Sequence, residues 1–365
     1  GLTAEETETV AWLVRFHLLM SNTAFKRDID DPQTIRGFTE RVQSPERLKL
    51  LLILTAADIR AVGPKVWNGW KATLLRELYH RAIEDMSGGL VADSRDARIA
   101  AAQSAARQML PDFSQQEMDA FIAKGYPSYW LSFDAATHAR HARLTREAER
   151  SAAPLTVDTR VDVKRAVTEV TLYTADHAGL FSRIAGALAL AGANIVDAKI
   201  LTLSNGMALD TFWVQDQSGG AFDRPDKLAK LAVLFENVLS GKIKPHLELS
   251  APDAIPSRTR VFTVPPRVLI DNKASLTHTV IEVNGRDRPG LLFEVTRALT
   301  TLNLQIFSAK ISTYGEKVVD VFYVKDLFGH KIEHDRKLKD IREHLVKVLA
   351  EPPARRARDK QVAAE

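Results

Sequence analysis

The sequence predicts an α+β protein, in which an all-helical N-terminal part precedes two copies of one small domain. The first observation is an internal repeat: Asp176-His177-Ala178-Gly179-Leu180-Phe181 returns 111 residues later as Asp287-Arg288-Pro289-Gly290-Leu291-Leu292. The second is that the correspondence continues in order, since residues 195–200 (IVDAKI) match 306–311 (IFSAKI). Two copies of one domain explain this recurrence, and chance does not. A tandem pair of small domains indicates a sensor, because ligands bind preferentially at the interface between such units.

The composition is that of a globular protein and points to neither nucleic acid nor membrane as a partner. The 365 residues predict two to four domains, and 45% hydrophobic with 26% charged residues is an ordinary balance. The net charge of +4 is too small and too dispersed to indicate nucleic-acid binding. The lack of cysteine excludes disulfides and thiolate metal sites and favours the cytoplasm. Apolar runs such as Leu50 to Leu54 are too short to cross a membrane. The chain opens with Gly1 and not with Met, which predicts a fragment of a longer protein.

Residues 1–87 are expected to form a helical domain. Ser44-Pro45-Glu46 is typical of a helix start, with an N-cap, a proline at the first helical position and an acid in the first turn. Gly63-Pro64 ends this helix, and residues 67–80 predict the next one. Residues 88–160 are expected to be a helical connector.

The first copy of the repeated domain is expected at residues 161–250. Its strands are predicted at 167–173, 193–202, 207–215 and 243–249, and its helices at 180–190 and 223–239. Asn205-Gly206, between the second and third strands, is the strongest short signal for a hairpin turn. The resulting order is βαββαβ, the ferredoxin-like arrangement.

The second copy is expected at residues 260–350 and lacks a closing strand of its own. Its strands are predicted at 279–283, 305–313 and 318–324, and its helices at 291–302 and 336–349. The prolines at 352 and 353 cannot pair in a sheet, so residues 351–365 are expected to be a polar tail. Arg260 to Ile270 is rich in Val and Ile, and we expect it to fill the gap in one of the two sheets.

Each copy carries an Asp-x-x-Gly-Leu loop between its first strand and its first helix. Glycine lets the backbone approach a ligand closely, and the helix N-terminus offers N–H groups and a positive dipole end to a carboxylate. Asp176 or Asp287 could hold an ammonium group, so each loop could bind a free amino acid. In one copy alone the aspartate would more readily be an N-cap and the glycine a turn residue. Repetition of the whole loop favours ligand binding.

The run Asp287-Arg-Pro-Gly-Leu-Leu292, with Asn303-Leu-Gln-Ile306 at the far end of the helix, resembles the ACT domain, a regulatory amino-acid-binding module. The resemblance implies that the loop of one domain and a polar residue at the start of a second strand hold the ligand across a domain interface. It assigns the polar contacts to Asp176, Asn194, Asp287 and Gln305. With the Gly-Leu pairs of the two loops, the predicted amino-acid contacts, to glutamine or another amino acid, are eight residues: Asp176, Gly179, Leu180, Asn194, Asp287, Gly290, Leu291 and Gln305. Ala178 replaces the family's usual proline, so the first loop is expected to bind more weakly.

Two polar residues of the helical domain, His17 and Asp58, are expected to point inward. Their neighbours at helical spacing are apolar: Leu13, Val14 and Met20 for the histidine, and Leu51, Leu54 and Val62 for the aspartate. A buried carboxylate needs a cation or hydrogen-bond donors. A lone inward histidine is more often a hydrogen-bonded core residue, whereas an inward aspartate near a helix end is more often functional.

Residues 5–80 resemble the C-terminal half of the HD-type phosphohydrolase domain in the bifunctional uridylyltransferase/uridylyl-removing enzymes. The matching segments are His17–Ser21, Asp28–Pro32, Leu54–Arg60, Trp67–Lys71 and Leu74–Tyr79. The aromatic linker at Tyr129-Trp130 and the two ACT copies follow in the family's order, so the resemblance covers nearly the whole chain.

In that family a nucleotidyltransferase domain adds UMP from UTP to a tyrosine of the PII signalling protein, and the HD domain removes it by metal-assisted hydrolysis. The resemblance implies that L-glutamine, bound by the ACT pair, suppresses addition and favours removal. It also implies that Asp58 is the catalytic and last metal carboxylate and that His17 lies near the metal. The metal would be a hard divalent ion, Mg²⁺ or Mn²⁺, which activates water for phosphodiester hydrolysis.

The helical domain lacks the His-Asp dipeptide that gives the HD family its name. The remaining metal ligands and the nucleotidyltransferase domain would then precede Gly1. Because a catalytic metal needs about three protein ligands, this chain alone is expected to be inactive and yet able to bind glutamine.

Two other classes stay open. A guanosine tetraphosphate synthetase/hydrolase also joins an HD domain to an ACT domain, but it usually carries one ACT domain, and the Trp67–Lys71 segment argues against it. A non-enzymatic amino-acid sensor made of ACT repeats is the second, and the long helical part ahead of the repeats argues against it.

Overall fold

One antiparallel sheet of eight strands joins the two copies of the repeated domain. The computed structural model describes residues 1–62, 66–88, 95–248, 265–288, 290–314 and 317–350. The strand order is β1-β2-β4-β3-β7-β8-β6-β5. The strands are β1 (Leu155–Asp162), β2 (Val167–Ala175), β3 (Asn194–Lys199), β4 (Met207–Gln215), β5 (Arg267–Asp271), β6 (Thr279–Arg286), β7 (Leu304–Tyr314) and β8 (Lys317–Asp326). The sheets predicted for the two copies are therefore one continuous sheet.

The two halves of the sheet meet where β3 pairs with β7. The paired residues are Asp197 with Lys310, Ala198 with Ala309, and Lys199 with Ser308. In the repeat Ala198 corresponds to Ala309, and Lys199 corresponds to Lys310. Ala198 thus faces its own counterpart, and Asp197 and Lys199 each face the counterpart of the other, which is the pattern that a two-fold axis through the alanine pair produces. We call this β3–β7 junction the seam.

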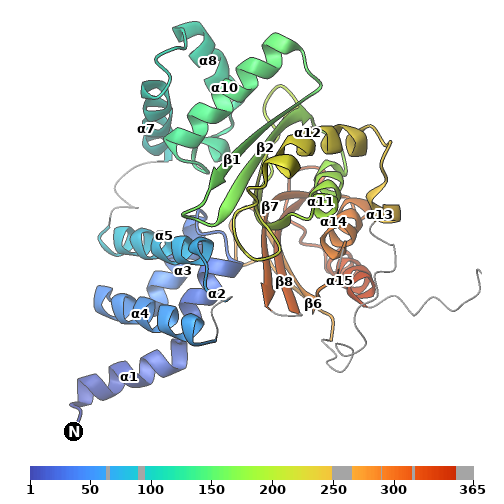
Figure 1. Cartoon of the computed structure of the whole chain (residues 1–365). Coiled ribbons are helices and arrows are strands. Elements are labelled where there is room, and N and C mark those ends of the chain that lie inside the picture. Colours follow the sequence, from blue (N-terminus) through green and yellow to red (C-terminus); the bar gives the residue numbers. More distant parts are fainter. Residues whose placement is uncertain (63–65, 89–94, 249–264, 289, 315–316, 351–365) are drawn as a thin grey trace, which may run out of the picture.

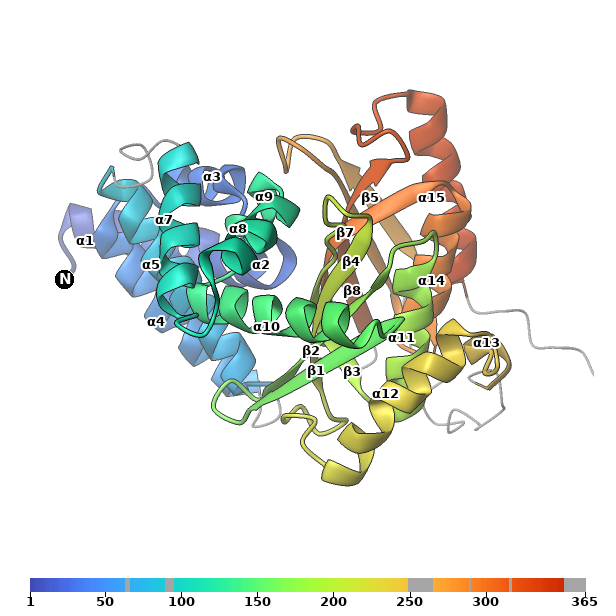
Figure 2. The same cartoon turned by 90° about the horizontal axis from the view of Figure 1, so that it is seen from above.

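Four long helices cover one face of the sheet, as Figures 1 and 2 show. They are α11 (Leu180–Ala191), α12 (Pro225–Leu239), α14 (Leu291–Thr301) and α15 (Asp335–Leu349), and the one-turn helix α13 (Pro245–Glu248) lies beside them. Their apolar sides share one core with the inward residues of the strands, including Phe212 and Phe322. Gly186 brings α11 close to its neighbours, because a Cβ there would lie 2.6 Å from Pro245 and 3.1 Å from Phe293.

The N-terminal helices cover the opposite face of the sheet (Figure 2). The helical domain contains α1 (Ala4–Phe16), α2 (Leu19–Lys26), α3 (Pro32–Val42), α4 (Pro45–Val62) and α5 (Gly69–Met86). The connector contains α7 (Arg95–Gln108), α8 (Gln115–Lys124), α9 (Pro127–Trp130) and α10 (Ala135–Ser151). Val167 and Trp213 of the sheet belong to the core of the helical domain, whereas Tyr173 and Leu209 belong to the core of the connector. Both helical parts are therefore packed on the sheet.

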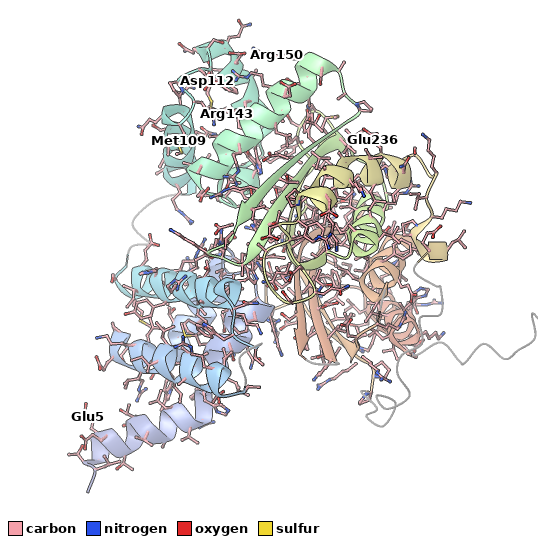
Figure 3. The ribbon with its side chains drawn as sticks, in the orientation of Figure 1. Glu5, Met109, Asp112, Arg143, Arg150 and Glu236 are labelled. Carbon is pink, nitrogen blue, oxygen red and sulfur yellow. The ribbon has the colours of Figure 1, made fainter. Side chains whose placement is uncertain are left out.

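Ion pairs on the outer side of the connector tie α10 to the segment before it. Asp112 accepts hydrogen bonds from Arg143 at 3.3 Å and from Arg146 at 2.6 Å, and Arg150 pairs with Glu117 at 3.0 Å. Figure 3 places Asp112, Arg143 and Arg150 on the outside of the molecule. Such exposed pairs contribute little stability each.

The predicted helix start at Pro45 is confirmed, whereas the helix predicted at residues 67–80 runs from Gly69 to Met86. Helix α4 begins at Pro45, and the Ser44 hydroxyl accepts a hydrogen bond from the Arg47 N–H at 3.2 Å. Helix α5 begins after Asn68, whose side-chain oxygen accepts a hydrogen bond from the Lys71 N–H at 3.0 Å. Among the described residues, no helix has both the length and the apolar content that a membrane span requires.

The closing strand predicted at residues 243–249 is wrong. Pro245 starts a short helix there, and residue 249 lies outside the described residues. The edge beside β2 is occupied instead by β1, which precedes the first copy and pairs with β2 along its whole length. The prediction for Arg260 to Ile270 is confirmed in part, since β5 pairs with β6, while residues 260–264 lie outside the described part. Each copy therefore has the order ββαββα. The tail at 351–365 also lies outside the described residues.

Candidate functional site

The two Asp-x-x-Gly-Leu loops have the same backbone conformation. Gly179 and Gly290 have φ values of 83° and 79°, a left-handed conformation that glycine adopts without strain. The helices α11 and α14 begin at the next residue, and neither has a side-chain cap. Leu180 and Leu291 are buried and anchor the helix starts in the core. The Gly-Leu pair thus presents an uncapped helix N-terminus, where the first N–H groups lack intrahelical acceptors.

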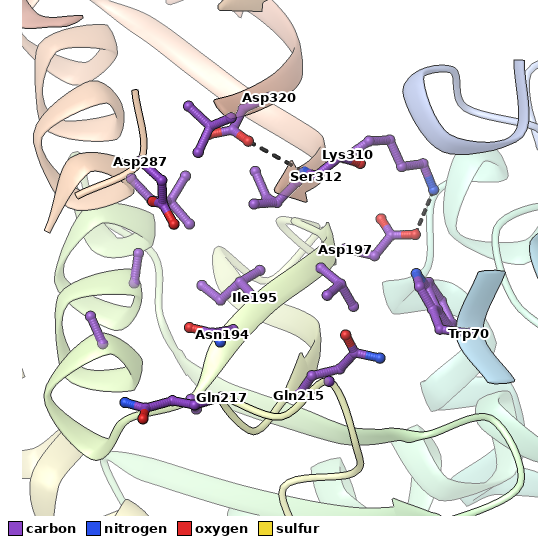
Figure 4. A pocket seen from close by; sticks show the side chains of 18 of the residues that line it. Trp70, Asn194, Ile195, Asp197, Gln215, Gln217, Asp287, Lys310, Ser312 and Asp320 are labelled. Atoms are coloured by element: carbon purple, nitrogen blue, oxygen red, sulfur yellow. Dashed lines mark hydrogen bonds and ion pairs between the residues drawn. The ribbon is translucent and has the colours of Figure 1, made fainter. Parts of the chain in front are cut away.

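A pocket of about 660 Å³ lies at the seam and joins the two copies. The loop of the second copy lines it with Asp287, Gly290 and Leu291, and the first copy contributes Asn194 at the start of β3. Figure 4 shows Asp287 and Asn194 on neighbouring walls of this pocket. The structure therefore brings together four of the eight predicted contact residues. We call this cavity the seam pocket.

The other four predicted contacts, Asp176, Gly179, Leu180 and Gln305, do not line the seam pocket. Asp176 is exposed and already accepts a hydrogen bond from the Thr202 hydroxyl at 2.5 Å. The Thr300 side chain of α14 lies beside the loop of the first copy, since a Cβ at Gly179 would lie 3.7 Å from the Thr300 methyl carbon. The counterpart of Thr300 in the repeat is Ala189, which lines the seam pocket. A smaller side chain on α11 thus leaves room beside the second loop.

Two acidic side chains give one wall of the seam pocket its chemistry. Burial, with a smaller contribution from the nearby Asp287, raises the pKa of Asp320 to about 8. Only the Ser312 N–H, at 3.4 Å, opposes this shift. Asp287 is accessible to solvent at the mouth of the pocket, yet the surrounding protein atoms still raise the pKa of its carboxyl. At neutral pH this wall therefore carries a protonated Asp320 beside an acid that can receive a cation.

The deep wall of the pocket contains a buried ion pair. Lys310 donates to Asp197 at 2.6 Å, and both residues line the pocket. Burial raises the pKa of Asp197 to about 6, against the opposing charge of Lys310, while Asp197 and its acidic neighbours hold the pKa of Lys310 above its usual range. Both groups are therefore charged at pH 7. The second oxygen of Asp197, Oδ1, is buried and has no hydrogen-bond partner among the described residues.

Sequence reasoning missed several pocket residues. Asp320 and Lys310 carried a visible signal, because each recurs in the repeat as Asp210 and Lys199. The N-cap Asn68 and the first turn of α5, with Trp70 and Lys71, also line the pocket. The sequence indicated the Trp67–Lys71 segment only as a point of resemblance to the family and not as part of a site. No sequence pattern links α5 to the seam, because their contact is formed only in the folded chain.

The inward orientation predicted for His17 and Asp58 is wrong. Both residues are exposed, and the His17 ring contacts the Val14 carbonyl oxygen at 2.8 Å. Packing on these faces stops short of the two polar residues: Leu51 is buried in the core, whereas Val62, one turn beyond Asp58, is 70% exposed, and α1 has no fully buried residue. The described residues contain no group of three His, Asp or Glu side chains that could hold a metal. These two residues do not form a metal site by themselves.

The sequence does contain one His-Asp dipeptide, His334-Asp335, but it lies outside the helical domain. His334 is the N-cap of α15 and Asp335 is its first residue. The dipeptide therefore belongs to the second ACT-like copy and gives no support to a metal site near Asp58.

Comparison with known proteins identifies an ACT domain in the second copy and close relatives of nearly the whole chain. A family model described as the ACR family N-terminal ACT domain matches residues 274–350. A bifunctional uridylyltransferase/uridylyl-removing enzyme of Azospirillum brasilense is 66% identical over 97% of this chain. Proteins of the same name from Gluconobacter oxydans and Rhodospirillum rubrum are 55% and 53% identical, over 97% and 98% of the chain. The chain spans only 38% of the length of each of these relatives. The relatives bear the name of the first family considered, and not of either alternative.

Proposed function

Since this chain is a relative of the bifunctional uridylyltransferase/uridylyl-removing enzymes over 97% of its length, we propose that it is the part of such an enzyme that senses L-glutamine. The observation that carries the proposal is the seam pocket, in which the Asp287 loop of one copy meets Asn194 of the other. An amino-acid effector would then be held between the copies, where it affects how they fit together.

The chemistry of the seam pocket suits a free amino acid. The carboxylate of Asp287 is accessible and would receive the ammonium group of the ligand. The uncapped N-terminal turn of α14, whose residues Leu291, Leu292 and Phe293 line the pocket, would receive the ligand carboxylate. Asn194 offers an amide that can both donate and accept, as a glutamine side chain requires.

The geometry supports one effector site in each chain. The first loop has its aspartate bonded to Thr202, and Thr300 lies beside its glycine, so a ligand that binds Asp176 there would have to displace the Thr202 hydroxyl. The second loop opens into the seam pocket. This asymmetry agrees with the weaker binding that Ala178 predicts for the first loop.

For the longer enzyme, we propose the reactions that the names of the relatives describe. UMP from UTP would be added to the PII signalling protein and removed again, with glutamine favouring removal. Mg²⁺ or Mn²⁺ would serve the removal step in that enzyme. The described part of this chain does not supply a metal site, so we derive no catalytic step from it. A cytoplasmic location fits these partners and the lack of cysteine.

Calorimetric titration of this chain with L-glutamine tests the sensing proposal. We expect saturable binding with one site per chain, and much weaker binding of L-glutamate, because its side-chain carboxylate cannot donate a hydrogen bond to the Asn194 oxygen as the amide of glutamine can. Saturating glutamine should also raise the melting temperature, since it binds the folded state. A folded chain that shows neither heat nor thermal stabilisation with glutamine would refute the proposal.

A further inference from the structure

Helix α5 of the helical domain forms one side of the seam pocket. Asn68, Trp70 and Lys71 from the start of α5, with Phe25 from α2, line the same cavity as the Asp287 loop. Figure 4 shows Trp70 on the side of the cavity away from Asp287. A ligand at the seam is therefore enclosed by three parts of the chain, the two copies and the helical domain.

We infer that the first turn of α5 is part of the effector site, and that a bound effector holds the helical domain against the sheet. The inference rests on the proposed glutamine binding at the seam. It adds that the first turn of α5 is the surface through which bound glutamine affects the helical domain. The effector would thus act directly on the helical domain, without a change that first crosses the whole sheet.

The start of α5 lies in direct contact with the backbone of the β1–β2 turn. A Cβ at Gly69 would lie 2.3 Å from the Lys164 carbonyl oxygen and 3.2 Å from the Arg165 Cα, so glycine alone permits this approach. Trp70 stacks on Trp213 of β4 with 6.1 Å between ring centroids, and the Arg165 guanidinium lies 5.1 Å from the Trp70 ring. Helix α5 therefore cannot move away from the sheet without changing this wall of the pocket.

A chain of buried and half-buried charges also links the pocket to the helical domain. Asp197 lines the pocket, and two residues further along β3 Lys199 forms an ion pair with Asp30 of the helical domain. Asp30 pairs in turn with Arg81 of α5. The cations Lys199 and Arg81 hold the pKa of the Asp30 carboxyl well below its usual range. These contacts form a continuous physical route from β3 to α5.

Asp197 provides the point at which a ligand would enter this route. Its Oδ1 atom is buried in the pocket wall without a hydrogen-bond partner among the described residues. Such an atom gains from any donor that reaches it. Thermodynamic linkage requires reciprocity. A ligand that binds more tightly when α5 is packed on the sheet must favour the packed position of α5 by the same factor.

Replacement of Gly69 tests the inference, with Gly37 as a matched control. Gly69→Ala should push α5 off the β1–β2 turn and weaken glutamine binding in calorimetry by about fivefold or more. Gly37 lies in α3, and a Cβ there meets no atom within 4 Å, so Gly37→Ala should bind as the unmodified chain does. Equal affinity of the Gly69→Ala variant and the unmodified chain would overturn the inference.

Hydrogen exchange on the unmodified chain provides a second test that does not depend on the folding of a variant. Saturating glutamine should slow amide exchange in α5 as well as in residues 290–295, where the second loop passes into α14. Slower exchange at 290–295 with no change in α5 would overturn the inference and leave the glutamine proposal intact. No heat and no change in exchange anywhere would refute both.

Discussion

Asp197 on β3 and Lys310 on β7 form an ion pair of 2.6 Å across the seam, with side chains that are only 4% and 5% exposed. The two residues face each other directly in the strand register. In the repeat Asp197 corresponds to Ser308 and Lys310 to Lys199, so only one of the two symmetric positions carries the acid. The pair thus makes the seam asymmetric on the side where the pocket opens.

Loss of the cation from this pair should destabilise the fold strongly. Lys310→Met would leave Asp197 as an unpaired charge in the interior and should lower the free energy of unfolding by about 3–5 kcal/mol. Lys339→Met serves as the control, because Lys339 is exposed on α15, and it should change stability by less than about 0.5 kcal/mol. Urea denaturation followed by circular dichroism measures both. A Lys310→Met loss equal to that of the control would show that the pair does not hold the seam.

Asp320 should make stability depend on pH. Its folded-state pKa of about 8 lies above the ordinary value of 3.8, so the folded chain keeps a proton that the unfolded chain releases. Stability from this group is therefore lost as pH rises from about 4 to about 8. The asparagine of the Asp320→Asn variant cannot ionise. The free energy of unfolding of this variant should therefore rise relative to that of the unmodified chain by about 1.4 kcal/mol for each pH unit in that range.

Urea denaturation at pH 5, 6 and 7 measures the effect of Asp320. Asp340→Asn is the control, because Asp340 is exposed on α15 and its replacement should give a profile parallel to that of the unmodified chain. A parallel profile for Asp320→Asn as well would show that Asp320 ionises normally in the folded chain.

Asp58 should affect catalysis in the longer enzyme without affecting the fold. Because it is exposed, Asp58→Ala should change the free energy of unfolding of this chain by less than about 0.5 kcal/mol. In the full-length enzyme the same change should abolish release of UMP from PII and leave UMP addition largely intact. Equal loss of both reactions, or a large loss of stability, would contradict the assignment of Asp58 to the removal site.

The repeat made most of the fold predictable, but not the edges of the sheet. Strands β1 and β5 occupy equivalent edge positions, yet their sequences, LTVDTRVD and RVLID, share no pattern. The repeat therefore gave no sign that β1 belongs to the first copy. Whether a segment forms an edge strand depends on the strand that it pairs with in the folded chain. The local sequence pattern carries no information about that partner.

The candidate site was predictable in its chemistry and not in its location. The loop residues Asp287 and Gly290 were visible in the sequence, but which loop opens into a pocket depends on Ala189 and Thr300 in the facing helices. The inward prediction for Asp58 was wrong for a related reason. An amphipathic pattern shows which side of a helix is apolar. Burial also requires a packing partner along that side, and on α4 the packing reaches Leu51 but not Val62.

The most direct test of the central claim compares the two loop aspartates in calorimetric titrations with L-glutamine. Asp287→Ala should weaken binding by about tenfold or more, because a hydrogen bond to a charged group contributes about 1.5–3 kcal/mol. Asp176→Ala should bind nearly as the unmodified chain does, because Asp176 lies outside the seam pocket and is bonded to Thr202. Stronger impairment by Asp176→Ala than by Asp287→Ala would contradict the assignment of the effector to the seam pocket.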